Sequence, residues 1–314
     1  MSKEIILNSE PNRQIEQLKH LESLLLNAPL LFENNISSGL LSQIDNSLSN
    51  DRLVLFVGNH QSYFESEVWA QIAQDLSKSC PNFKGIYLPY SAPATDSNVG
   101  AIFNQREQHY RDNKLFMLPV IREIDRTSEK YSKAITPKME KDNAESMYKM
   151  VHARKEHYAI ICLPEGSLKA GRTNPETGKI FGMQPVVDKT FLDLIFKKGK
   201  ANKMISQTDL VPIGIDGCYK IFSSDTYTFS DNLTFLFKYN QTDTYTSSNQ
   251  QIYLLKNSQK IVSINANKII PAVEYLSYDG NVIEHIMRKE VAPLVSTEAQ
   301  GVYNSQNRVN LDKI

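Results

Sequence analysis

LVLFVGNHQSYFE, residues 53–65, is the stretch of sequence that best indicates the fold. An apolar run stops at a glycine, and Asn59 and His60 follow at once. Apolar residues then recur at helical spacing over residues 64–76. The pattern predicts a buried strand that delivers His60 to a strand-to-helix turn, where open α/β sheets usually carry their binding sites.

Similar patterns continue along the chain. Apolar runs predict four more strands, at residues 85–88, 115–121, 158–163 and 210–215. Helical patterns lie between them, at residues 102–111, 138–155 and 186–198. This alternation predicts an α/β fold with a mainly parallel central sheet and helices on both faces. Short β-like runs after residue 226 predict C-terminal antiparallel edge strands, and residues 281–294 a closing helix.

The N-terminal part has a different residue pattern. Residues 12–26 carry leucines and isoleucine at helical spacing and predict an amphipathic helix, which either packs on the main body or touches a bilayer. Residues 35–50 are rich in Ser and Asn and are expected to form a loop. We therefore expect an N-terminal helical segment over residues 1–50 and a main domain over residues 51–314.

Composition excludes several classes of protein. Lys+Arg and Asp+Glu both number 35, so no overall positive field indicates a nucleic-acid partner. No run of about 18 apolar residues predicts a membrane span, and no secretory signal is recognisable. The three cysteines show no metal-binding or disulfide spacing. These features predict a cytoplasmic protein.

His60 and Glu65 are the first candidate catalytic residues. On a regular helix, residues five apart point about 140° away from each other and would not meet. With His60 in the turn and Glu65 in the first helical turn, the carboxylate can fold back onto the imidazole and stabilise the imidazolium, as a general base requires. The alternative is a capped helix start with an exposed histidine. A zinc site is not expected, because no second histidine lies at helical spacing.

The second motif is LPEGSLKAGR, residues 163–172, at the end of a predicted strand. Gly166 allows close approach to backbone N–H groups, and Lys169 and Arg172 supply positive charge. Such a turn can hold a phosphate, although a plain surface loop has the same composition.

Together, the two motifs resemble the glycerolipid (lysophosphatidic acid) acyltransferase family. That family carries Asn-His-x4-Asp, then Phe-Pro-Glu-Gly-Thr-Arg, and later an apolar strand with a proline, which VPIGI at residues 211–215 resembles. The resemblance covers about residues 53–216. It implies transfer of a fatty acyl group from acyl-CoA or acyl carrier protein to a hydroxyl of glycerol phosphate or a lysophospholipid. The acyl thioester is then a co-substrate, and no metal or other cofactor is expected. The resemblance also implies contact with a membrane surface, so the protein is expected to be cytoplasmic or peripheral on the inner membrane face.

The resemblance also assigns roles to residues. It makes His60 the general base and Glu65 its orienting partner. It implies substrate binding by seven residues: Asn59, Arg122, Glu165, Gly166, Ser167, Lys169 and Arg172.

Three positions depart from the family pattern. Glu65 stands where the family has Asp, Ser167-Leu168 replaces Thr-Arg, and the arginine between the motifs has two candidates, of which we favour Arg122 over Arg126. Two rival functions therefore stay open. One is a non-catalytic lipid- or acyl-binding protein on the same fold, and the other is a thioester or lipid hydrolase in which His60 activates water.

The remaining histidines and cysteines carry less weight. His109, His152 and His157 lie on polar helical faces and are expected to be solvated. Cys162 lies inside an apolar run with no histidine local to it, so we expect an inert core thiol.

Overall fold

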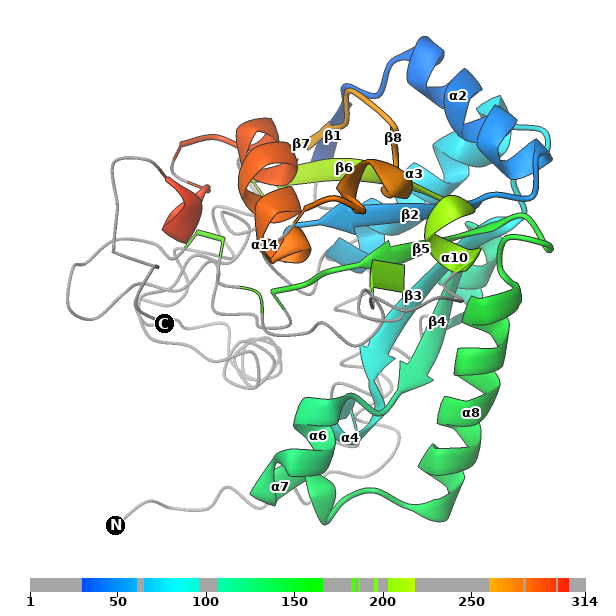
Figure 1. Ribbon diagram of the computed structural model, residues 1–314, viewed down its shortest axis with the longest axis vertical. Helices are drawn as coiled ribbons and strands as arrows, with labels where there is room; N and C mark the ends of the chain where they lie inside the picture. The colour runs from blue at the N-terminus through cyan, green and yellow to red at the C-terminus, as the bar shows by residue number, and fades with distance from the viewer. Residues whose placement is uncertain are drawn as a thin grey trace, which may run out of the picture.

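The strands form one mainly parallel sheet, as the sequence predicts (Figure 1). The computed structural model describes residues 30–60, 65–95, 107–165, 182–183, 186, 195–196, 203–217, 260–278, 281–297 and 299–304. Its strands are β1 (Leu30–Asn34), β2 (Leu53–Gly58), β3 (Gly85–Ser91), β4 (Leu115–Val120), β5 (Tyr158–Cys162), β6 (Thr208–Asp216), β7 (Lys260–Asn265) and β8 (Ile270–Pro271). Their order is β1-β7-β6-β2-β5-β3-β4, with β8 beside β6. The run from β6 to β4 is parallel throughout, so the chain has the α/β class.

Helices occupy most of the described connections. They are α2 (Ser38–Ser49), α3 (Glu65–Ser79), α4 (Ala92–Thr95), α6 (Glu123–Thr127), α7 (Glu129–Ser132), α8 (Pro137–His152), α10 (Lys203–Ser206) and α14 (Val282–Ile286). Residues 107–112 are also helical. The predicted closing helix is α14, which continues as a π-helical turn, Met287–Val291, and a 3₁₀ turn, Ala292–Leu294. None of the described helices combines the length and the apolar character needed to cross a membrane.

Alternate residues of β2 contribute to two separate apolar clusters, because successive side chains of a strand point to opposite sides of the sheet. Val54 and Phe56 pack with α2 and α3, and the ring centroids of Phe56 and Trp69 are 5.9 Å apart. Leu55 and Val57 belong to the other cluster, together with side chains of α8 and α14. All six residues of β2 are buried, so the strand lies at the centre of the molecule.

The outer strands differ from the expectation. β7 runs antiparallel to β6, but β1 pairs with β7 in parallel and forms the edge of the sheet. β7, which was predicted to be an edge strand, therefore lies inside the sheet, because β1 pairs with its other side. The other predicted β-like runs, between residues 226 and 256, and the predicted helix at residues 12–26 lie outside the described residues.

The expected loop at residues 35–50 is largely the helix α2. Ser37 caps it by accepting a hydrogen bond from the Leu40 backbone N–H. Leu40, Ile44 and Leu48 recur every four residues and are buried in the same core as α3. Because Ser and Asn are numerous in this segment, the sequence analysis did not recognise the three apolar residues as one face of a helix.

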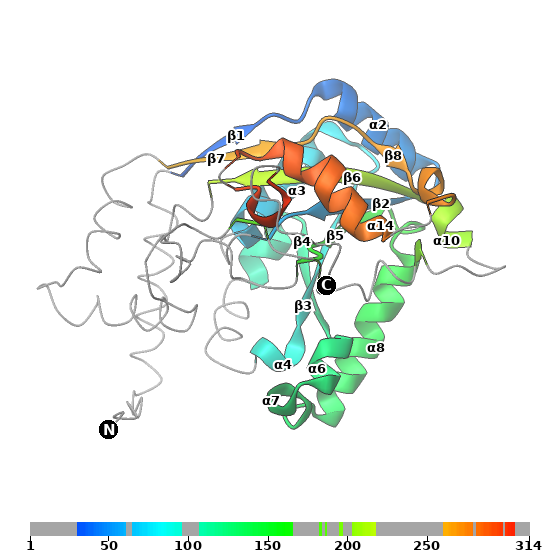
Figure 2. The same cartoon turned by 60° about the vertical axis from the view of Figure 1, so that its left-hand side comes forward.

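The sheet is strongly twisted, so the directions of β3 and β4 make a steep angle with those of β6 and β2 (Figure 2). In a parallel sheet the carboxyl ends of all strands lie along one edge. That edge carries His60 after β2, Glu165 after β5 and Arg122 after β4.

Candidate active site

His60 and Glu65 form a hydrogen-bonded pair, as expected. His60 Nδ1 lies 2.7 Å from Glu65 Oε2, and Glu65 is the first residue of α3. The side chain of Glu65 is 3% exposed and that of His60 is 20% exposed. The carboxylate is thus buried behind the imidazole, and the helix N-terminus favours its negative charge.

This pair sets the chemistry of the imidazole. A carboxylate that accepts a hydrogen bond from Nδ1 leaves the lone pair on Nε2. Within the described part of the chain, His60 Nε2 has no hydrogen-bond partner. The arrangement can accept a proton at Nε2 while Glu65 stabilises the imidazolium that results.

Asn59 holds the end of β2 in place. Its side chain is fully buried and makes two hydrogen bonds to one residue of the neighbouring strand β6. Nδ2 donates to the Ile215 carbonyl at 2.8 Å, and Oδ1 accepts from the Ile215 N–H at 2.8 Å. Asn59 therefore ties the backbone next to His60 to β6, and its expected contact with substrate stays a prediction.

Glu165 joins the second motif to the first. It follows β5, the other neighbour of β2, and its side chain is fully buried. Glu165 Oε1 accepts a hydrogen bond of 3.0 Å from the His60 backbone N–H. The two motifs, 105 residues apart, thus meet at His60.

The first turn of α3 is also anchored on its other side. Glu67 Oε1 accepts from the Tyr110 hydroxyl at 2.9 Å, and Glu67 Oε2 lies 3.2 Å from His109 Nε2. Ser66 Oγ lies 2.8 Å from the same hydroxyl. His109 is therefore not simply solvated as expected: it is part of the contact that fixes the start of α3, and the helical pattern alone could not show its partner.

The other histidines and Cys162 also differ in detail from the expectation. His152 Nδ1 lies 2.9 Å from the Tyr148 carbonyl within α8. Nδ1 of His157 is buried without a hydrogen-bond partner in the described structure. Cys162, expected in the core, is only partly buried because it is the last residue of β5.

Arg122 lies at the carboxyl edge of the sheet but apart from the pair. Three strand spacings separate β2 from β4, which is roughly 14 Å or more. Asp125 holds the guanidinium through Nε at 3.1 Å and Nη2 at 3.0 Å, and also accepts from the Arg122 backbone N–H at 2.9 Å. Asp125 is completely buried and accepts a further hydrogen bond from Ser91 at the end of β3. Asp125 thus fixes the orientation of the Arg122 side chain. The sequence analysis did not predict this contact.

The remaining candidates of the second motif, Gly166, Ser167, Lys169 and Arg172, lie outside the described residues. Among the residues that the structure describes, no cluster of His, Cys, Asp or Glu could hold a metal ion.

A C-terminal residue reaches the same region. The hydroxyl of Tyr303 donates to Glu284 Oε2 at 3.1 Å, and Tyr303 is buried. Burial raises the pKa of Tyr303, and the negative charges of Glu284 and Glu165 raise this pKa further. Residues 299–302 are joined to Met183 by backbone hydrogen bonds of 2.8 and 3.0 Å. The C-terminal segment therefore contributes to the surroundings of Glu165, and no local sequence signal indicated this.

Neither protein-family models nor the curated proteins searched give a match to this chain.

Proposed function

We propose that this protein is an O-acyltransferase that moves a fatty acyl group from a thioester, on coenzyme A or acyl carrier protein, to an alcohol. The single observation that supports the proposal best is the buried Glu65 carboxylate 2.7 Å from His60 Nδ1. A general base must be oriented and must be stabilised when protonated, and this pair meets both requirements.

The proposed reaction needs no covalent enzyme intermediate. His60 Nε2 takes the proton of the acceptor hydroxyl as its oxygen attacks the thioester carbonyl carbon. The tetrahedral intermediate then collapses, the carbon–sulfur bond breaks, and the leaving thiolate takes the proton from His60. An ester and a free thiol result, so atoms and charge balance.

We propose a glycerol phosphate or a lysophospholipid as the acceptor. Arg122 lies on the edge that carries His60 and is held in a fixed orientation by Asp125. Nε and Nη2 of Arg122 already bind Asp125, so we propose Arg122 as a contact of the acceptor phosphate only together with other cationic groups. Lys169 and Arg172 follow Glu165 in the sequence and are proposed as additional cationic groups. An acceptor of this kind would bring the enzyme to the inner face of a membrane as a peripheral protein.

We assign Asn59 and Glu165 to positioning. Both side chains are completely buried. Asn59 binds the backbone of β6, and Glu165 binds the backbone N–H of His60. They would act by fixing the turn that carries the base, not by touching the acceptor.

The decisive experiment measures three products from the purified protein. Acyl-CoA and a lysophospholipid are supplied, and free thiol, acylated lipid and free fatty acid are quantified. Transfer predicts thiol and acylated lipid in equal amounts. The His60→Ala variant should lose at least about 100-fold in rate, or about 2.7 kcal/mol of barrier, while its thermal unfolding stays close to wild type.

A matched control is His152→Ala, which removes a histidine from α8, and it should keep full activity. Unchanged rates in a folded His60→Ala protein would remove the mechanism. Free fatty acid formed without an acceptor would indicate the hydrolase instead. Lipid bound without turnover would indicate the binding protein.

A further inference from the structure

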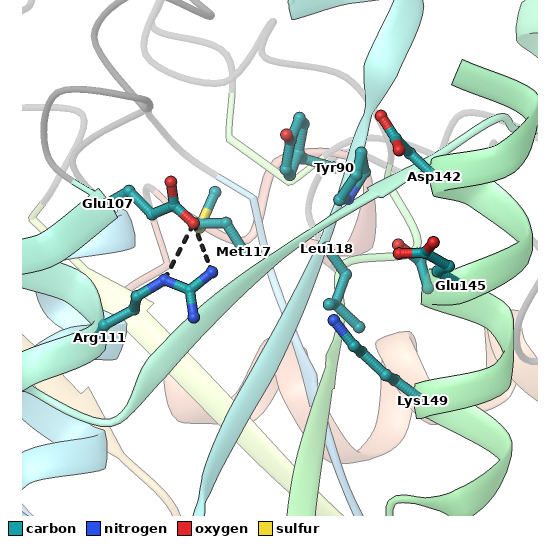
Figure 3. A pocket seen from close by; sticks show the side chains of 10 residues that line it. Tyr90, Glu107, Arg111, Met117, Leu118, Asp142, Glu145 and Lys149 are labelled. Atoms are coloured by element: carbon teal, nitrogen blue, oxygen red, sulfur yellow. Dashed lines mark hydrogen bonds and ion pairs between the residues drawn. The ribbon is translucent and has the colours of Figure 1, made fainter. Parts of the chain in front are cut away.

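A cavity of about 200 Å³ lies at the outer edge of β4, away from the His60–Glu65 pair. One wall is the helical segment at residues 107–112, and the other is α8. Figure 3 shows Glu107 and Arg111 on one side of the strand and Asp142, Glu145 and Lys149 on the other. None of these residues belongs to the proposed acyl-transfer machinery.

The floor of this cavity is formed by residues 117–119 of β4, the last strand of the sheet in the part of the chain that the structure describes. The Ile86 N–H donates to the Lys114 carbonyl at 2.8 Å. In a parallel ladder, successive residues alternate between the two neighbouring strands, so Met117 and Pro119 direct their backbone groups away from β3. Pro119 has no N–H, which leaves two carbonyl acceptors and one N–H donor on this side. The floor is therefore rich in acceptors.

The walls add negative charge around an aromatic ring. Tyr90 lines the cavity, and its pKa is raised by burial and then by the charges of Glu107 and Asp142. Those two carboxylates come from opposite walls. Tyr90 thus lies between them and presents a neutral phenol to the cavity.

The carboxylates on the two walls are not equivalent. Glu107 is neutralised by Arg111, whose Nε and Nη2 lie 2.9 and 2.5 Å from Glu107 Oε1. Asp142 and Glu145 have no hydrogen bond or ion pair to any other described residue; Asp142 is half-buried, whereas Glu145 is exposed, so Asp142 is the carboxylate that matters here. Both side chains point from α8 toward β4 in Figure 3. A half-buried carboxylate is stabilised by a cationic partner.

We propose that this cavity binds a primary ammonium group, supplied by a small amine or by the amino headgroup of a lipid. An ammonium carries three N–H donors and no acceptor. It can donate to Asp142 and to the outward carbonyls of β4 while lying near the ring of Tyr90. The proposal concerns binding alone and does not depend on acyl transfer.

Two other occupants fit the cavity less well. An added β-strand needs regularly spaced donors and acceptors along the edge, and Pro119 interrupts them. The lining holds two cations. Arg111 is already engaged by Glu107, and Lys149 is outweighed by Asp142 and Glu145 on the same helix, which an anion would also face. The small volume and the net negative lining both favour a compact cation.

The test titrates ethanolamine into the full-length protein by isothermal calorimetry at constant ionic strength, with glycerol as the uncharged control. We expect saturable binding of ethanolamine and none of glycerol. Asp142→Asn should weaken binding at least about fivefold, which corresponds to about 1 kcal/mol. The matched control is Glu129→Gln, a carboxylate on α7 whose side chain is 92% exposed, and it should bind as wild type does.

Two further arms complete the experiment. Phosphoethanolamine that binds more tightly than ethanolamine would assign a lipid headgroup, and equal affinities would assign a free amine. His60→Ala should bind ethanolamine normally, so the result stands whether or not the protein transfers acyl groups. The inference is overturned if ethanolamine does not bind saturably, or if Asp142→Asn and wild type bind it equally well in folded protein.

Discussion

Replacing Glu65 separates the charge of its carboxylate from its ability to accept a hydrogen bond. Glu65→Gln keeps an oxygen acceptor for His60 Nδ1 but removes the negative charge. Two unit charges about 4 Å apart, at an effective dielectric constant of about 20, interact by about 4 kcal/mol. Because the His60 side chain is 20% exposed, we reduce this value for screening by solvent to about 2–3 kcal/mol. The expected loss in kcat/KM for Glu65→Gln is therefore ~30- to 150-fold.

Glu65→Asp keeps the charge and changes the reach. The shorter side chain withdraws the carboxylate by about 1.5 Å, one carbon–carbon bond. The gap of 2.7 Å to Nδ1 then widens unless the backbone moves, but most of the Coulomb interaction survives. We expect a loss of about tenfold or less, about 1.4 kcal/mol.

The assay is thiol release from acyl-CoA with a saturating lysophospholipid, measured for wild type and both variants, with circular dichroism to check the fold. The predicted order of kcat/KM is Glu, then Asp, then Gln. A Glu65→Gln protein as active as wild type would show that the carboxylate has no catalytic role. That result would favour the binding-protein alternative.

Three further predictions concern structure and binding. Asn59→Ala leaves the buried N–H and carbonyl of Ile215 without partners, so urea unfolding should show a loss of about 2–5 kcal/mol, and a loss under 1 kcal/mol would contradict the role of this contact. Replacing Lys169 and Arg172 with alanine should raise KM for a phosphorylated acceptor more than KM for acyl-CoA; equal effects in steady-state kinetics would mean that the turn is structural. Burial raises the pKa of Cys80 to about 11, so at pH 8 the thiol is protonated, and its alkylation by iodoacetamide should be roughly 100-fold slower than in urea and accelerate toward pH 11. Mass spectrometry of the Cys80 peptide checks this, and equal rates in folded and unfolded protein would refute it.

The central part of the fold was predictable because its signals are local. β2 and β5 are apolar runs that end at a glycine or a Pro-Glu pair, and α3 has a clear apolar stripe. The His60–Glu65 contact was predictable for a related reason. β2 ends at Gly58 and α3 begins at Glu65, and His60 and Glu65 are only five residues apart, so few arrangements of the turn are available.

The parts that were not predicted depend on distant partners. β1 is short, and its pairing with β7 has no local signal. The capture of Arg122 by Asp125 follows from the helical turn of α6, which the sequence analysis did not expect. The contact between Glu67 and His109 joins two helices, and periodicity describes each helix separately. Sequence patterns identify a buried face, but they do not identify what covers it.

The pairing of β1 has a consequence for biosynthesis. Asn35 beside β1 bonds to Asn265 at the end of β7, 230 residues later in the chain. At a translation rate of about 5–20 residues per second, the wait between the two is roughly 10–45 s. During that time LLFEN has no partner strand from β7. The nascent chain thus carries β1 without this neighbour until residue 265 has been added.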